Sequence, residues 1–242
     1  FGIMQPINKI KSYCVNRNIF LVEDCAHILP DLNINFQNRA GTFGDISIFS
    51  LRKQLPVQDG GLLVINTNNI DLPGNSCSNK VVNIKKITLQ IVENFFFIIG
   101  FINIHPLKIR LKKYFRKAGE NAKSNNKNYG ISYLSSFLLK HLCIKTNIQK
   151  KKENYKFLLD RIHDRKGVRV PFKNLPVGSV PQFFPIYIND LELKTLLQKK
   201  MLAKGIGVGF WPEKEKIKQV EFSRYPGSED WINRNILIPV HE

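Results

Sequence analysis

The sequence has few cysteines, few acidic residues and no uninterrupted apolar run of membrane-spanning length. Its four cysteines, Cys14, Cys25, Cys77 and Cys143, lie far apart, with no C-x-x-C pair and no spacing typical of metal ligands. In a chain of 242 residues, this pattern predicts reduced thiols in a reducing, cytoplasmic compartment. We therefore expect neither disulfides nor a metal site.

Acidic residues are scarce: 19 Asp and Glu stand against 37 Lys and Arg, which gives a net charge of +18. Such an excess raises the possibility of nucleic-acid binding. The lysines are spread through many segments, however, and no recognition helix, RNP-like or zinc-finger pattern accompanies them. We therefore predict no nucleic-acid partner, although a basic surface would attract an anionic substrate such as a nucleotide-linked one.

The longest apolar stretch, residues 87–104, is interrupted by polar side chains and followed by the basic run 108–117. A membrane-spanning helix needs about 20 mostly apolar residues, so we do not expect one here. An apolar run beside a basic one could rest on an anionic membrane surface through residues 87–117. The preferred interpretation is a helical insertion over 67–127 that packs on its own protein or on a partner subunit.

The first part of the chain is typical of an α/β layer. A helix is predicted over 5–17, and apolar strands over 19–22, 46–50 and 61–66. Ligands of open α/β sheets bind beyond the carboxyl ends of strands, and Asp24, Ser50 and Lys53 follow such ends. A lysine that forms an imine and a carboxylate that keeps a pyridine nitrogen protonated are the groups that pyridoxal phosphate chemistry requires.

The second part predicts connecting helices and a small α+β domain. The helical segment Ser132 to Ile162 is expected to break near Thr146 and Asn147. Further elements are a strand at 183–188, a helix at 190–203, a strand at 206–210, and a short turn that starts at Trp231 before a strand at 236–238. The domain boundaries that we predict are 1–66, 67–127, 128–165 and 166–242.

Residues 23–61 carry three motifs in a fixed order. They are Glu23-Asp24-Cys25-Ala26-His27, the stretch 41–50 (G-T-F-G-D-I-S-I-F-S), and Lys53 followed by Asp59-Gly60-Gly61. In order and spacing these resemble the sugar aminotransferases of the DegT/DnrJ/EryC1/StrS family. Weaker similarities at 128–132, 151–155 and 236–241 extend the resemblance to nearly the whole chain outside 67–127.

The resemblance implies an α/β fold of the aspartate-aminotransferase type (fold type I), with a partial large domain and a small α+β C-terminal domain. Members of the family carry an N-terminal part that holds the cofactor phosphate cradle and a stacking aromatic ring, and they end on a further helix. Neither part is found in this sequence, whose ends both look cut. We therefore expect a fragment of a longer protein.

The resemblance also assigns roles around the cofactor, pyridoxal 5'-phosphate. Lys53 would form the imine and act as the catalytic residue. Asp24 would pair with the pyridinium nitrogen, or only cap a helix after its strand. His27 would contact the ring oxygen, or be an ordinary packed histidine. Ser50 would bind the phosphate, or only cap the turn after its strand. Asn128 would reach the cofactor of the other subunit, or be an ordinary loop residue.

Three positions depart from the family pattern. Ser50 and Lys53 lie closer together than usual, Arg52 stands where many members have histidine, and Gly130 replaces an arginine that contacts phosphate. These departures leave a non-catalytic relative as an alternative. Gly60 and Gly61 are expected to serve backbone geometry, and Trp211 either lines the substrate site or packs the small domain.

The function that the resemblance implies is a ping-pong aminotransferase, acting as a homodimer. It would move an amino group from glutamate to a nucleotide-linked keto-deoxysugar for polysaccharide or glycoconjugate biosynthesis. Related sugar dehydratases carry histidine in place of the imine lysine, so Lys53 argues against that activity.

Overall fold

The structure is a computed structural model, and it describes residues 1–68, 70, 130–162, 165–209, 211 and 221–240. Most of the predicted insertion 67–127, its stretch 87–117 and Asn128 lie outside the described residues. No helix of the described part is both long and apolar enough to cross a membrane.

The first sheet follows helix α1 (Ile7–Val15) and has the order β1-β2-β3, with β1 at Val22–Cys25, β2 at Ile46–Ser50 and β3 at Gly61–Ile65. Strands β1 and β2 are parallel, whereas β2 and β3 are antiparallel. This confirms the second predicted strand at its exact bounds and the third to within one residue.

The first predicted strand, 19–22, was wrong in its position. The backbone N–H of Leu21 is taken by the Asp45 carboxylate, at 2.8 Å, so pairing with β2 starts only at Val22. Asp24 consequently lies within β1 and not after it. Ile19 and Phe20, expected in a buried strand, are 47% and 53% exposed.

The two faces of the first sheet differ sharply. Glu23, Ser47 and Phe49 point to the buried side, where Phe49 shares a core with apolar side chains of α5 and α6. Val22, Ile48 and Leu63 lie on the opposite face and are each about half exposed. The first sheet is therefore buried mainly on one face.

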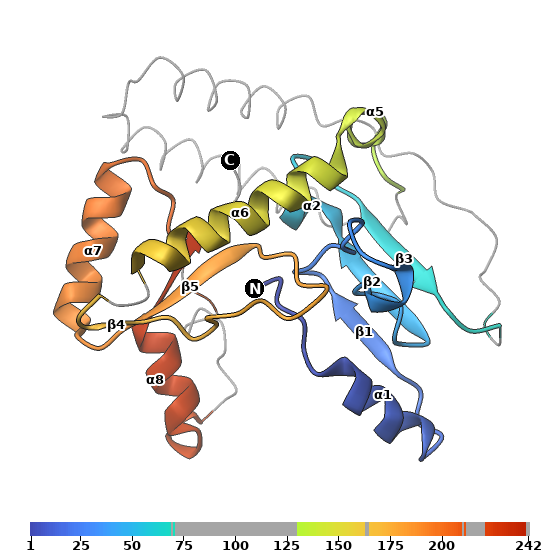
Figure 1. Cartoon of the computed structure of the whole chain (residues 1–242), viewed down its shortest axis with the longest axis horizontal. Coiled ribbons are helices and arrows are strands. Elements are labelled where there is room, and N and C mark those ends of the chain that lie inside the picture. Colours follow the sequence, from blue (N-terminus) through green and yellow to red (C-terminus); the bar gives the residue numbers. More distant parts are fainter. Residues whose placement is uncertain (69, 71–129, 163–164, 210, 212–220, 241–242) are drawn as a thin grey trace.

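Two helices lead to the second half of the molecule, α5 (Tyr133–His141) and α6 (Ile144–Ile162). The break between them falls at Leu142 and Cys143 and not at 146–147, because Leu142 takes an extended conformation that ends α5. Figure 1 shows α6 running from the first sheet to the second. Ile148 belongs to the core of the first sheet, and Tyr155 to that of the second.

The second sheet is antiparallel, with β4 (Val168–Arg169), β5 (Phe183–Ile188) and β6 (Asn235–Pro239) in that order. Helix α7 (Leu191–Ala203) begins after Asp190, whose carboxylate accepts the N–H groups of Glu192 and Leu193. Of the predicted strand 206–210, the described residues 206–209 form a single bridge, between Gly209 and Leu237. Trp231 does not start a turn, because it lies within α8 (Pro226–Arg234).

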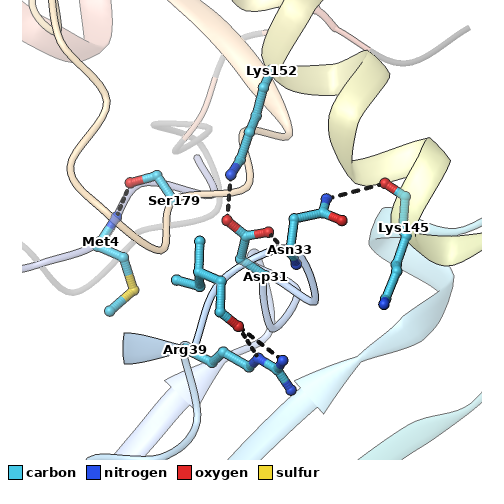
Figure 2. Close-up of polar contacts among 8 residues, drawn as sticks. Met4, Asp31, Asn33, Arg39, Lys145, Lys152 and Ser179 are labelled. Carbon is cyan, nitrogen blue, oxygen red and sulfur yellow. Dashed lines mark hydrogen bonds and ion pairs between the residues drawn. The ribbon is translucent and has the colours of Figure 1, made fainter. Parts of the chain in front are cut away.

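A buried carboxylate ties the segment after β1 to α6. Asp31 is fully buried, forms an ion pair with Lys152 and accepts the backbone N–H of Asn33 at 3.1 Å. The Asn33 amide in turn donates to the Lys145 carbonyl, at 3.2 Å. Figure 2 shows Lys152 and Asn33 meeting the Asp31 carboxylate, and the Asn33 side chain reaching the Lys145 carbonyl. These contacts fix the position of α6 relative to the segment that follows β1.

Replacing Lys152 by methionine should destabilise the fold by about 3 kcal/mol, because the buried Asp31 carboxylate loses its cation. Urea unfolding measures the change. Lys156→Met is the matched control, since Lys156 is exposed on the same helix, and it should change stability by less than about 0.5 kcal/mol. Equal effects of the two substitutions would show that the ion pair does not stabilise this contact.

Candidate functional site

The loop before β2 is wrapped around the Glu23 side chain. This buried carboxylate accepts the backbone N–H groups of Gly41 (3.2 Å), Phe43 (2.7 Å) and Gly44 (2.6 Å), and the Ser47 hydroxyl (3.2 Å). Gly41 has φ +90°, and a Cβ there would lie 2.3 Å from the Phe49 ring. The glycines and the acidic residue of the motif thus hold β2 beside β1.

Lys53 lies in α2 (Leu51–Gln54), the single helical turn that follows β2. Its Nζ is 2.9 Å from Nε2 of His27, which comes shortly after β1. The folded chain therefore brings together two of the predicted site residues, from the carboxyl ends of two neighbouring parallel strands.

Gln182 determines the tautomer of His27. Its Oε1 lies 2.7 Å from Nδ1 of His27, and its Nε2 donates to the Lys53 carbonyl at 2.9 Å. Because an amide oxygen only accepts, Nδ1 carries the hydrogen and the lone pair of Nε2 faces Lys53. Burial lowers the pKa of His27, and the Lys53 charge lowers it further. At neutral pH the imidazole is therefore uncharged and accepts a hydrogen bond from Lys53.

Sequence analysis missed Gln182 and Gln54. Gln54 directly follows Lys53, and its Nε2 donates to the His27 carbonyl at 2.5 Å. No motif marks Gln182, which lies 155 residues from His27 along the chain. For Gln54 the only available signal was its position beside the predicted lysine.

Asp24 and Ser50 lie beside this pair. The Asp24 side chain is exposed, and its Oδ1 accepts the backbone N–H of Ala26 at 3.0 Å. Its negative charge acts on His27, whose pKa it raises slightly against the larger lowering by burial. Ser50 precedes α2, but its hydroxyl caps no N–H of that helix. The capping role considered for Ser50 is therefore not observed.

Trp211 flanks the site. Its ring centroid lies 5.5 Å from that of His27 and 6.1 Å from that of Phe1, and the residue is 52% exposed. An aromatic surface thus stands beside the imidazole that contacts Lys53.

The turn at Gly60 contacts the first residue of α2. Gly60 has φ +116°, and a Cβ there would lie 2.9 Å from the Ile131 side chain. Its carbonyl accepts the N–H of Leu51, at 3.1 Å, and so fixes the start of α2. The neighbouring Asp59 carboxylate accepts the Ser132 hydroxyl at 2.9 Å.

Within the part of the chain that the structure describes, no group of three or more His, Cys, Asp or Glu could hold a metal ion.

Replacing Gln182 by glutamate should raise the pKa of His27, because a carboxylate at this position stabilises the imidazolium. In the unchanged protein the His27 ring protons should titrate with a midpoint below 6.5. The contact with Lys53 is then complete above pH 6.5 and is lost as the pH falls through that midpoint. NMR titration measures both values.

Gln182→Leu is the matched control for this substitution, since it removes the acceptor without adding a charge. Its His27 midpoint should stay below 6.5, because burial and Lys53 still disfavour the charged ring. An unchanged midpoint in Gln182→Glu would show that residue 182 does not set the protonation of His27.

Comparison with known proteins places the first part of the chain. Residues 1–82 match the sequence model of the DegT/DnrJ/EryC1/StrS aminotransferase family. No curated protein matches the chain.

Many solved structures match this chain, among them three that match it over nearly its whole length. PseC of Helicobacter pylori, an aminotransferase involved in pseudoaminic acid biosynthesis, is 16% identical, with a TM-score of 0.61 over 99% of this chain and 59% of its own. A proposed sugar aminotransferase of Streptococcus pneumoniae, Spr1654 in its PMP form, is 13% identical, with a TM-score of 0.56 over 99% and 62%. DesI, solved in the presence of its TDP-sugar product, is 16% identical, with a TM-score of 0.51 over 98% and 55%.

At these identities the structures show the fold: the chain has an α/β fold that matches part of an aminotransferase. The chain spans less than two thirds of the length of each matched structure, which agrees with the expectation of a fragment.

Proposed function

We propose that this protein is a pyridoxal-phosphate-dependent sugar aminotransferase in which Lys53 binds the cofactor, because residues 1–82 match the sequence model of the DegT/DnrJ/EryC1/StrS aminotransferase family. The observation that carries this proposal is the contact of Lys53 with an uncharged His27 at the carboxyl ends of β1 and β2.

The described residues fit pyridoxal phosphate by their chemistry. When bound, this cofactor supplies an aldehyde for an amine and a ring that withdraws electrons from the substrate. Lys53 offers the amine, and Asp24 offers a carboxylate for the ring nitrogen. The Ser50 hydroxyl, which caps no helix N–H, can donate to a phosphate.

His27 prepares the Lys53 amine. A lysine is a nucleophile only when its Nζ is uncharged, so it must first lose a proton. The lone pair of His27 Nε2 lies 2.9 Å from Nζ and accepts its hydrogen, which fixes the direction of the amine, while Gln182 keeps the other ring nitrogen protonated. Once released from the cofactor, the same amine can move a proton at the substrate α-carbon.

The acceptor that we propose is a nucleotide-linked keto-deoxysugar, with glutamate as the amino donor. DesI, which was solved with a TDP-sugar product, and PseC, which is involved in pseudoaminic acid biosynthesis, support this class. The net charge of +18 favours approach of an anionic nucleotide. We further propose that the protein is a cytoplasmic homodimer.

Covalent trapping of the cofactor tests the proposal. The protein, expressed from its complete reading frame, is mixed with pyridoxal phosphate, reduced with borohydride and mapped by mass spectrometry. We expect the label on Lys53, and the exposed lysines Lys9 and Lys140 serve as internal references. A folded protein in which Lys53 is labelled no more than these references would overturn the aminotransferase proposal.

A non-catalytic relative is the second candidate function, and two observations favour it. The short segment from Ser50 to Lys53 places the lysine within a single helical turn, and Gly130 provides no cation for a phosphate. Absence of the Lys53 label, with the fold intact, would support this candidate.

A further inference from the structure

A buried lysine on α6 reaches the turn that carries Lys53. Lys151 is 2% exposed, and its Nζ lies 2.6 Å from the Gln54 carbonyl oxygen and 2.8 Å from Gln54 Oε1. We propose that Lys151 is a positioning residue that acts through Gln54 to hold Lys53 against His27. This inference rests on the proposed role of Lys53.

The buried position of the Lys151 amine is unfavourable for its charged form. Burial lowers the pKa of Lys151 to about 8, and no carboxylate of the described residues forms an ion pair with it. A lowered pKa means that folding is disfavoured while the amine is charged, and that stability rises as the pH rises above 8. Lys151 therefore does not stabilise the fold through its charge. The contribution of Lys151 is therefore its two hydrogen bonds to Gln54.

The contact with Lys151 also fixes the direction of the Gln54 amide. An ammonium group only donates, so it binds the oxygen of the amide and turns Nε2 away from itself. That Nε2 donates to the His27 carbonyl. Gln54 therefore connects Lys151 with both members of the pair: it follows Lys53 in α2, and its side chain holds the backbone of His27. Without the ammonium group, the amide is free to rotate and His27 loses this support.

Lys151, which lies on α6, also contacts the last residue of α2. The Gln54 carbonyl is the last of this helical turn, and the Lys151 ammonium group donates to it at 2.6 Å. Gln182 holds the Lys53 carbonyl from the second sheet, at 2.9 Å. The two carbonyls that follow the Lys53 Cα are thus held by long-range contacts, one from α6 and one from the residue before β5.

The experiment compares Lys151→Met with Lys151→Arg. Methionine keeps the length of the side chain and removes its donors, whereas arginine keeps the charge and the donors. In the complete protein, the rate at which pyridoxal phosphate and borohydride label Lys53 is measured relative to the exposed Lys9. We expect Lys151→Met to slow the labelling of Lys53 by at least about tenfold, because a small displacement of a reacting group lowers its reaction rate by this much. Arginine should restore most of the rate.

A double substitution separates positioning from a general loss of structure. If Lys151 acts through Gln54, then Lys151→Met adds little to Gln54→Ala, and the two effects are not additive. Gln54→Ala alone should slow the labelling of Lys53 as much as Lys151→Met does. This variant therefore tests the inference even if Lys151→Met does not fold. Labelling of Lys53 at the wild-type rate in either folded variant would overturn the inference.

A second readout does not depend on the cofactor. When His27 is released from Lys53, the midpoint of its NMR titration should rise toward 6.5 in Lys151→Met and return in Lys151→Arg. If wild-type Lys53 is not labelled, the proposed function fails, while this shift still tests the link from Lys151 to His27. An unchanged His27 midpoint in a folded Lys151→Met protein would overturn the inference by itself.

Discussion

Replacing Lys53 by methionine should lower the rate of amino transfer by at least about 10³-fold, because the variant lacks the nucleophilic amine that we propose for the reaction. The reaction is measured as formation of 2-oxoglutarate from glutamate in the presence of pyridoxal phosphate and the complete protein. The reductive label at position 53 should disappear in the same variant. Both losses have one cause, the missing Nζ that lies beside His27.

Lys140→Met is the matched control, since Lys140 is an exposed lysine on α5 and should leave both readouts unchanged. Lys53→Arg refines the test: arginine keeps a positive charge beside His27 but is not a nucleophile, so it should be as inactive as methionine. Full activity of Lys53→Arg would show that the residue acts through its charge and not through its amine.

The second large effect is expected at Glu23. Replacing this residue by alanine should destabilise the fold by about 4 kcal/mol, because three backbone N–H groups and the Ser47 hydroxyl lose their acceptor in a buried place. Urea unfolding, followed by circular dichroism, measures the change. Since Glu23 holds β2, which leads into α2, Lys53 labelling should fall as well.

Glu23→Gln serves as the matched variant. It keeps one acceptor oxygen and the shape of the side chain, so it should cost about half as much as alanine. Glu192→Ala controls for the loss of a carboxylate on the exposed helix α7. A Glu23→Ala protein as stable as Glu192→Ala would show that water replaces the carboxylate around the loop 41–44.

Several elements could be predicted accurately from sequence, and the reason is local. Strands β2 and β5 were confirmed at their exact bounds because short apolar segments there lie between residues that favour turns. The errors arose where a tertiary contact outweighed the local pattern. Asp45 takes the N–H of Leu21 and moves the start of β1, and the described residues 206–209 pair with β6 through a single bridge to Leu237. The domain boundaries stay a prediction.

The sequence by itself determined the family motif over residues 23–61 and the choice of Lys53, Asp24 and His27 as candidates, because these follow from residue types at fixed spacing. Only the tertiary structure decided what surrounds Lys53: the tautomer of His27, the bridge made by Gln182 and the buried amine of Lys151. These contacts join residues up to 155 positions apart. They exist only once α6 and the second sheet pack against the first, and no local pattern encodes that packing.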